Sequence, residues 1–297
     1  MLVFLNGRFV PEDQAVVSVF DRGFLYGDGL FETLRVRNGK PFRWTQHMER
    51  LQCGARLLKI RIPVPLDSLR ASADQLISRN HLPDSLLRLT LSRGVGPRGY
   101  SPRGADLPTL VMSLHPAPAA DPALGRADRQ AGPDARQRVP AMRWKLITAS
   151  PRLPAGEQLA QFKTCNKLPQ IIARSEAEAA GADEALLLNT AGFVVEGSGS
   201  NLFWVEAGTI CTPPLAGGIL AGVTRSVVLD LCRSLGVNVR EDNVTVEELR
   251  RRQGIFLSVS SWGVVEAESL DGHALGHSPQ IDQIRFSYWD LVRSETA

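Results

Sequence analysis

The chain contains few amines that could act as nucleophiles. Of the 34 basic residues only five are lysines, at positions 40, 59, 145, 163 and 167. Lys163 lies in the segment QFKTCNK, after an irregular stretch and just before a predicted helix. A lysine amine placed beside a carbonyl group can form a Schiff base with it. Lys163 is therefore a candidate for covalent chemistry.

Two features of the second half of the chain could complement such a lysine. Glu196 ends the apolar run FVVEGSGSN, where a carboxylate is costly to bury unless a cation or hydrogen bonds compensate it. Gly222-Val223-Thr224-Arg225 opens a predicted amphipathic helix, whose first N–H groups and positive dipole end favour a phosphate. The alternatives are an exposed strand end and an ordinary loop-to-helix turn. An amine, a buried acid and a phosphate-binding helix start together suggest pyridoxal phosphate.

Two other patterns are typical of sites but lack the necessary context. Gly94–Gly99 reads G-x-G-x-x-G after a predicted strand, yet Pro97 and Pro102 lie where a dinucleotide site needs a helix to begin. We interpret it as a loop. His273 and His277 are four residues apart, but in a Gly/Ser/Pro-rich segment without other metal ligands nearby. The sequence therefore predicts no metal site.

The elements of the first 116 residues start with two hairpins. Asn6-Gly7 and Asn38-Gly39 each separate two β-rich runs, and Asn-Gly provides the positive φ angles of a tight hairpin turn. We expect a helix from about Thr45, with that residue as N-cap, and a second helix over residues 66–79. Strands are expected near residues 86–92 and 109–115.

Beyond this half the composition changes. Residues 116–137 are rich in Pro, Ala, Gly and charge and have no hydrophobic period, which indicates a segment between domains. Short strands and helices follow, and Thr245-Val-Glu-Glu248 reads as a capping box. We expect strands at 142–149, at four short apolar runs between 184 and 213, and at 255–261, and helices at 169–180, 223–235 and 279–293. Strands and helices alternate irregularly, so the predicted class is α+β.

Composition is that of a globular protein, with 43% apolar and 22% charged residues and a net charge of +3. The basic residues are scattered, which argues against a nucleic-acid partner. The long uncharged run 207–224 contains Pro213 and Pro214, so we expect no membrane helix, and we see no signal peptide. The four cysteines form no C-x-x-C pair, which fits reduced thiols and a cytoplasmic location.

Six stretches in register resemble the class IV (fold type IV) pyridoxal-phosphate aminotransferases, a family that includes branched-chain and D-amino-acid aminotransferases and aminodeoxychorismate lyase. They are DRGFLYGDGLFETLRV (21–36), HMERL (47–51), SRGVGPRGYSP (92–102), FKTCNKLPQIIARSEAEAAGADEALLLN (162–189), VVEGSGSNLFWVEAGTICTPPL (194–215) and GILAGVTR (218–225). The resemblance implies a smaller N-terminal α+β domain (1–116), an interdomain segment (117–137) and a larger, β-rich cofactor-binding domain (138–297). It also implies a homodimer with the cofactor between the domains.

The same resemblance assigns roles to individual residues. Lys163 would form the Schiff base and then move a proton between the substrate Cα and the cofactor C4′; Lys167, four positions on, is the rival that the family motif disfavours. Glu196 would keep the pyridine nitrogen protonated. The remaining cofactor contacts would come from Arg50 to the phosphate, from Leu220 on the ring face, from Val223 and Thr224 at the helix start, and from a hydroxyl of Ser260 or Ser261.

On the substrate side the resemblance points to Tyr26, Phe31, Arg98 and Tyr100. Arg98 matches the arginine with which similar D-amino-acid enzymes hold a carboxylate, a role that suits a guanidinium fork. The reaction we expect is amino transfer between an amino acid or amine and a 2-oxo acid. The alternative is aminodeoxychorismate lyase, which the run RGVGPRGYSP resembles most and which converts 4-amino-4-deoxychorismate to 4-aminobenzoate and pyruvate. A binding protein without activity and a nicotinamide oxidoreductase are the alternatives from other classes.

Overall fold

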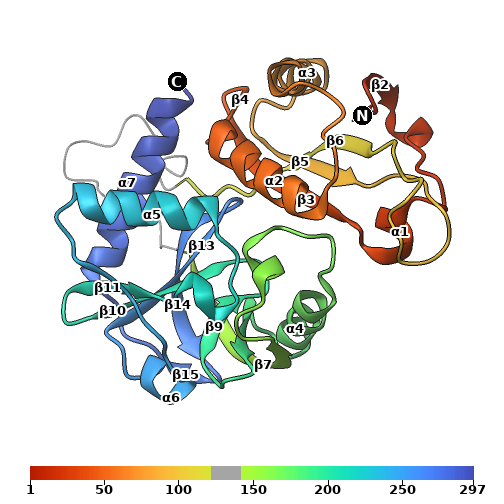
Figure 1. Ribbon diagram of the computed structural model, residues 1–297. Helices are drawn as coiled ribbons and strands as arrows, with labels where there is room; N and C mark the ends of the chain where they lie inside the picture. Colours follow the sequence, from red (N-terminus) through yellow and green to blue (C-terminus); the bar gives the residue numbers. More distant parts are fainter. Residues whose placement is uncertain (122–141) are drawn as a thin grey trace. The chain divides into compact units, whose positions relative to one another are not determined.

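The computed structural model describes residues 1–121 and 142–297 (Figure 1). The chain forms two compact units. Unit 1 comprises Met1–Ala117, Phe162–Lys167 and Val292–Ala297, and unit 2 comprises Pro118–Gln161 and Leu168–Leu291. Most of the predicted segment 117–137 lies outside the described residues, and the domain limits derived from the sequence remain a prediction.

Unit 1 is built on a six-stranded antiparallel sheet with the strand order β2-β1-β6-β5-β3-β4. Its strands are β1 (Leu2–Leu5), β2 (Arg8–Pro11), β3 (Gly29–Arg37), β4 (Lys40–Pro41), β5 (Ser85–Ser92) and β6 (Thr109–Pro116). Both predicted hairpins are confirmed. Asn6 and Asn38 have φ angles of 49° and 51°, and a glycine with positive φ follows each of them, as a two-residue turn of this type requires.

The helices of unit 1 are η1 (Glu12–Gln14), α1 (Arg22–Tyr26), α2 (Trp44–Leu58) and α3 (Leu66–Arg79). The apolar faces of α2 and α3 pack on one face of the sheet, so that Leu51 and Leu69 share a core with Leu87 (Figure 1). The prediction of Thr45 as N-cap is wrong. The helix begins at Trp44, and Arg43, with a φ of 56°, is the N-cap residue and makes no side-chain cap.

Unit 2 contains a nine-stranded sheet that closes on itself. The path runs β12-β11-β10-β13-β14-β7-β8-β9, β9 pairs again with β10, and β15 pairs with β14. The strands are β7 (Arg143–Leu153), β8 (Glu184–Asn189), β9 (Val194–Gly197), β10 (Asn201–Glu206), β11 (Thr209–Thr212), β12 (Val239–Glu241), β13 (Gly254–Val259), β14 (Gly263–Leu270) and β15 (His273–Ala274). The sequence did not predict β14, which is central to this sheet.

The helices that accompany this sheet are η3 (Gln158–Gln161), α4 (Leu168–Ala179), η4 (Leu215–Gly217), α5 (Val223–Ser234), α6 (Val246–Leu249) and α7 (Pro279–Glu295). Ala173 and Ala177 of α4 pack against Leu187 of β8, and small residues here let the helix approach the strand closely. Sheets with helices outside a regular βαβ series confirm the predicted α+β class. None of the helices in the described ranges is long and apolar enough to span a bilayer.

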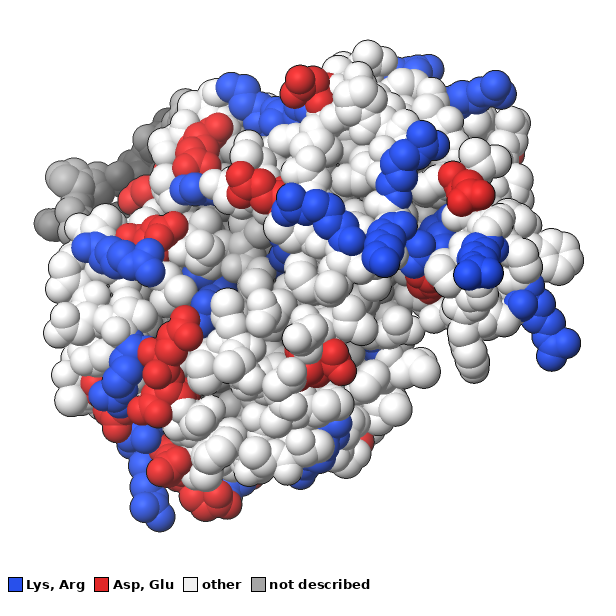
Figure 2. Space-filling view, viewed as in Figure 1, with Lys and Arg blue, Asp and Glu red and all other residues white. Residues whose placement is uncertain are grey.

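Charged side chains of both signs are interspersed on the face of the molecule shown in Figure 2. Areas without charged side chains separate them. This distribution matches the small net charge of +3.

Candidate active site

The segment that carries Lys163 is held against strand β3 of unit 1. Phe31 donates its backbone N–H to the Lys163 carbonyl at 2.8 Å, and Cys165 donates to the Gly29 carbonyl at 2.9 Å. A β-bridge between Leu30 and Thr164 lies between these two bonds. The Lys163 amine is 4.7 Å from the centre of the Phe31 ring. Phe31 and Lys163, which are 132 positions apart in the sequence, thus lie side by side.

Arg50 has a carboxylate partner, Glu32, on the core face of the same strand. Its Nε donates to Glu32 Oε1 at 2.8 Å and its Nη2 donates to Oε2 at 2.5 Å, while His47 Nδ1 lies 2.7 Å from Oε2. Burial would raise the pKa of the Glu32 carboxyl, but the charge and hydrogen bonds of Arg50, aided by His47, hold that pKa at about 2. Glu32 is therefore an anion that orients the guanidinium predicted to bind a phosphate.

His47 is fully enclosed beside this pair. Burial lowers the pKa of its imidazole below the ordinary value, against the opposing influence of Glu32. The neutral ring then carries its proton on Nδ1, because a carboxylate can only accept a hydrogen bond.

Phe31 contacts a second cation on its own face of the sheet. Phe31 pairs with Thr90 and Thr33 pairs with Arg88, so that Phe31 and Arg88 point to the same side. The Arg88 guanidinium lies 4.0 Å from the centre of the Phe31 ring. Burial lowers the pKa of this arginine. Within residues 1–121 and 142–297 the Arg88 side chain has no hydrogen bond or ion pair.

The predicted substrate residues Tyr26, Arg98 and Tyr100 belong to helix α1 and to the loop that follows β5. The Tyr26 hydroxyl accepts a hydrogen bond from Gly99 N at 2.9 Å, and the Tyr26 and Tyr100 rings meet edge to face at 5.8 Å. Residues 94–99 form no helix, so the loop interpretation of this glycine-rich motif is confirmed.

Arg22 fixes the backbone of the same loop. Its guanidinium donates to the carbonyls of residues 97, 99 and 100 at 2.8–3.4 Å, while its Nε donates to Asp28 at 2.9 Å. Arg93 also donates to the Asp28 carboxylate. Burial opposes ionisation of Asp28, but hydrogen bonds and charges of the two arginines lower its pKa below the ordinary value. Arg98 itself remains exposed.

Unit 2 brings together the predicted acid and the predicted phosphate contacts. Glu196 lies in β9, is 8% exposed, and accepts a hydrogen bond from Leu220 N at 2.9 Å. Two residues later Gly222 is the N-cap of α5, and no side chain caps this helix. The buried Thr224 hydroxyl lies 3.4 Å from that of Ser260, at the end of β13. The helix start predicted at Val223 is confirmed.

These residues fit pyridoxal phosphate. A buried carboxylate at the end of an apolar strand can stabilise a protonated ring nitrogen, which an ordinary strand end does not need. An uncapped helix start with two hydroxyls beside it offers a phosphate both N–H and O–H donors. Glycine at position 222 lets the Asn201 side chain pack against the helix start, because a Cβ there would lie 2.0 Å from Asn201 Oδ1.

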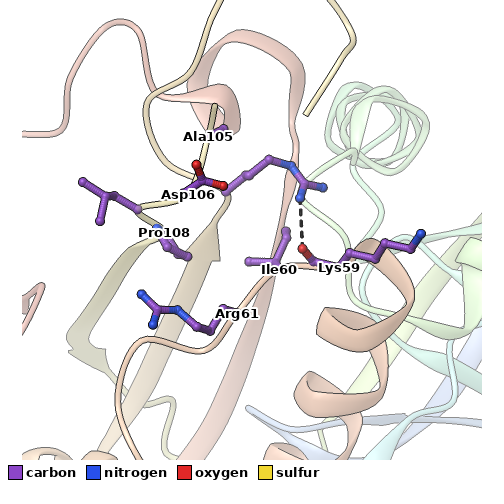
Figure 3. Close-up of a pocket in the computed structure, with 8 residues that line it drawn as sticks. Lys59, Ile60, Arg61, Ala105, Asp106 and Pro108 are labelled. Carbon is purple, nitrogen blue, oxygen red and sulfur yellow. Dashed lines mark hydrogen bonds between the residues drawn. The ribbon is translucent and has the colours of Figure 1, made fainter. Parts of the chain in front are cut away.

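A separate cavity of about 510 Å³ lies on unit 1, with Lys59, Ile60, Arg61 and Asp106 in its wall (Figure 3). Lys59 and Arg61 extend in opposite directions from Ile60 in this view. Arg93, also in the wall, donates hydrogen bonds to the Leu58 and Lys59 carbonyls in addition to those to Asp28. None of the residues predicted for the site lines this cavity.

Sequence reasoning missed Glu32, His47, Arg88 and Arg22. Glu32 had a usable signal, because it is a lone acid in the apolar strand GLFETLRV, the same pattern that singled out Glu196. Arg88 and Arg22 had none, since their partners are set by strand register and loop conformation.

Comparison with known proteins supports the same chemistry. The sequence model of the family "Amino-transferase class IV" matches residues 29–270. A "Putative branched-chain-amino-acid aminotransferase" of Methanocaldococcus jannaschii is 36% identical over 96% of this chain and 92% of its own. A D-alanine aminotransferase of Bacillus licheniformis is 30% identical over 100% of this chain and 99% of its own length. An aminodeoxychorismate lyase of Bacillus subtilis is 30% identical over 84% of this chain and 79% of its own length.

Solved structures share the fold. The branched-chain aminotransferase of Thermoproteus uzoniensis with norvaline superposes with a TM-score of 0.87 at 28% identity, over 99% of this chain and 95% of that one. The branched-chain aminotransferase of T.th. with pyridoxamine 5′-phosphate gives 0.86 at 27% identity, over 99% and 94%. The predicted fold, enzyme class and cofactor class are confirmed: the chain belongs to the class IV aminotransferases, pyridoxal-phosphate-dependent enzymes of fold type IV.

Proposed function

We propose that this enzyme moves an amino group between an amino acid or amine and a 2-oxo acid, through a Schiff base between Lys163 and pyridoxal phosphate. The observation that carries the proposal is the hydrogen bond from Leu220 N to the buried Glu196 carboxylate. Leu220 lies two residues before Gly222, the N-cap of α5, which has no side-chain cap. A ring acid and a phosphate cradle are the two fixed contacts that this cofactor needs. Family membership supports the same assignment.

When bound, pyridoxal phosphate supplies a conjugated ring that accepts the electron pair left at the substrate Cα. Glu196 would accept a hydrogen bond from the ring nitrogen and keep its proton in place. The N–H groups of Val223 and Thr224 and the hydroxyls of Thr224 and Ser260 or Ser261 would donate to the phosphate. Leu220 would pack on the ring face.

Lys163 holds and moves the proton. Its backbone is held on β3, because its carbonyl accepts a bond from Phe31 N and Cys165 N, two residues later, donates to the Gly29 carbonyl. The amine would take the proton from the substrate Cα and return it at C4′ of the bound cofactor. Arg50, whose guanidinium is held by two bonds to Glu32, would contribute a positive charge and a hydrogen bond to the phosphate.

Tyr26, Phe31, Arg98 and Tyr100 form the substrate side. Arg98 pairs with the substrate carboxylate through its planar fork. Its loop is a suitable base because Arg22 and Tyr26 bond its backbone at several points. Phe31 provides an apolar wall next to the Lys163 amine.

We further propose a homodimer in the cytoplasm. Residues 16–25 of unit 1 expose several large apolar side chains, among them Val16 at 79%, Phe20 at 65% and Phe24 at 74%. Such a cluster favours a second copy of the chain as its cover. All four cysteines are free, which suits a reducing compartment.

Absorbance of the purified protein tests the proposal. We expect a band near the visible edge that is absent in Lys163→Ala and retained in Lys167→Ala, the matched control four residues away. Single-turnover mixing with D- and L-amino acids, (R)-amines and 4-amino-4-deoxychorismate then identifies the donor. Conversion to the pyridoxamine form identifies a transaminase.

Pyruvate release from 4-amino-4-deoxychorismate without that conversion would instead identify the lyase, which the 30% identity to the Bacillus subtilis enzyme keeps as the second candidate. A band that persists in Lys163→Ala would refute the role of this lysine.

A further inference from the structure

The sheet of unit 2 closes at one residue pair, and that pair contains the proposed ring acid. Strands β9 and β10 pair only through Glu196 and Asn201. Both residues are buried, Glu196 at 8% and Asn201 at 4% exposure. The side chains of two directly paired residues lie on the same face of a sheet and close together.

That shared neighbour is Leu220. Glu196 Oε2 accepts from Leu220 N at 2.9 Å, and Asn201 Nδ2 donates to Leu220 O at 3.0 Å. Gly222 N also donates to Leu220 O, at 2.8 Å, which makes a tight turn over residues 220–222. Both backbone polar groups of Leu220 are therefore fixed by the two closing residues of the sheet.

Asn201 also fixes the start of helix α5. A Cβ at Gly222 would lie 2.0 Å from Asn201 Oδ1, so the amide packs directly on the Gly222 backbone. Gly222 is the N-cap of α5, and Thr224 lies in the first turn. One side chain thus touches the turn at its first and last residue.

We propose that Asn201 is a positioning residue, which sets the ring acid and the phosphate cradle at a fixed spacing without touching the cofactor itself. The inference rests on the proposed function. The Asn201 amide holds Leu220, Leu220 N holds the Glu196 carboxylate, and Asn201 Oδ1 sets the place of Gly222 at the helix start. Loss of the amide releases the turn that joins both cofactor contacts.

The chain offers a matched control. Asn189, 3% exposed at the end of β8, donates from Nδ2 to Gly217 O at 3.2 Å, in the same loop but three residues before Leu220. Its Oδ1 accepts from the N–H groups of Ala191 and Phe193. Asn189→Ser therefore removes at least as many hydrogen bonds as Asn201→Ser, at a site without a cofactor contact.

The experiment measures the dissociation constant of pyridoxal phosphate by absorbance titration, together with the Tm of each cofactor-free protein. Asn201→Ser and Asn201→Asp, which lacks the amide hydrogens but keeps the size, are expected to raise the constant about tenfold, the effect of one lost hydrogen bond. Asn189→Ser is expected to lower Tm and leave the constant within about twofold. Equal constants for Asn201→Ser and Asn189→Ser would overturn the proposal.

A double-mutant cycle tests the contact with Gly222. Gly222→Ala alone is expected to lower both Tm and affinity, because its Cβ overlaps the Asn201 amide. Asn201→Ser in that background removes the overlap and should restore part of both losses, so that the two effects are not additive. Additive losses would overturn the proposal. Retention of the visible band in Lys163→Ala would refute the proposed function and this inference with it, whereas loss of that band with unchanged Asn201 variants would refute this inference alone.

Discussion

The guanidinium of Arg50 donates two parallel hydrogen bonds to the carboxylate of Glu32, from Nε at 2.8 Å and from Nη2 at 2.5 Å. The carboxylate is 1% exposed, so its charge depends almost wholly on this partner and on His47. A fork-to-fork pair fixes the plane of the guanidinium as well as its position.

Glu32→Gln is expected to destabilise the protein by about 3–5 kcal/mol, because it leaves the Arg50 charge buried without its counter-ion. The measurement is urea unfolding. Glu49→Gln, at an exposed position of helix α2 next to Arg50, serves as control and should change the free energy of unfolding by less than about 0.5 kcal/mol. Similar effects of the two substitutions would contradict the role given to Glu32.

Acid should remove the contribution of Glu32. Its folded-state pKa is about 2, below the ordinary 4.5, so the ionised carboxylate stabilises the fold fully above pH 4.5. That stabilisation, about 3 kcal/mol, is lost as the pH falls from 4.5 toward 2. The free energy of unfolding of the wild type should therefore fall more steeply than that of Glu32→Gln over this range. Parallel curves would rule out the paired carboxylate.

His47 should add a second slope at higher pH. Burial lowers the pKa of its imidazole below 6.5, so the unfolded chain binds the proton more readily than the folded one. The contribution of neutral His47 to the free energy of unfolding is therefore fully present above pH 6.5 and declines as the pH falls below that value. His47→Gln keeps a donor for Glu32 and should flatten the curve between about pH 7 and pH 5. His115→Gln, an exposed control, should leave the slope unchanged.

Arg22→Met is expected to loosen the loop that carries Arg98, since the guanidinium bonds three of its carbonyls. Trypsin cleavage after Arg98 should become about a hundredfold faster, because three hydrogen bonds are lost and each contributes on the order of 1 kcal/mol to the closed loop. KM for the amino donor should rise more than kcat falls. Arg8→Met, an exposed arginine on β2, is the control and should change neither. An unchanged cleavage rate in Arg22→Met would show that other contacts hold the loop.

Thr245→Ala is expected to cost about 1 kcal/mol. Thr245 and Glu248 form the complete capping box that the sequence predicted, in which each side chain bonds the backbone of the other. Chemical denaturation of Thr245→Ala and of Thr245→Ser, which keeps the hydroxyl, separates the cap from packing. A Thr245→Ser variant as unstable as Thr245→Ala would exclude the cap as the cause.

Local signals in the sequence predicted local structure well. The Asn-Gly turns, the capping box and the start of α5 each depend on residues within four positions, so a single stretch contains all the necessary information. The α2 cap failed because Arg43 adopts a left-handed conformation that its side chain does not favour. Strand β14 was missed because its residues, GVVEAESL, show no clear alternation of apolar and polar side chains.

The candidate site was foreseen as residue types but not as geometry. Lys163 and Glu196 were found because an amine and a buried acid are unusual where they occur. Their neighbours depend on pairings between distant strands, such as Glu196 with Asn201 and Phe31 with Thr90, which a single sequence does not encode in any short pattern. Family resemblance supplied roles, while the hydrogen bonds that orient Arg50 and Leu220 came only from the fold.

The docking of residues 162–167 on β3 has a consequence for hydrogen exchange. The amides of Phe31 and Cys165 are bonded across this junction, so they become accessible to solvent only when the edge of β3 opens. Their protection should therefore follow that of the central strands of unit 1, although the residues that flank segment 162–167 in the sequence, 161 and 168, belong to unit 2. The free energy needed to expose the backbone around Lys163 to solvent is thus set by β3, more than 120 residues away in the sequence. It is not set by the helix that follows the lysine.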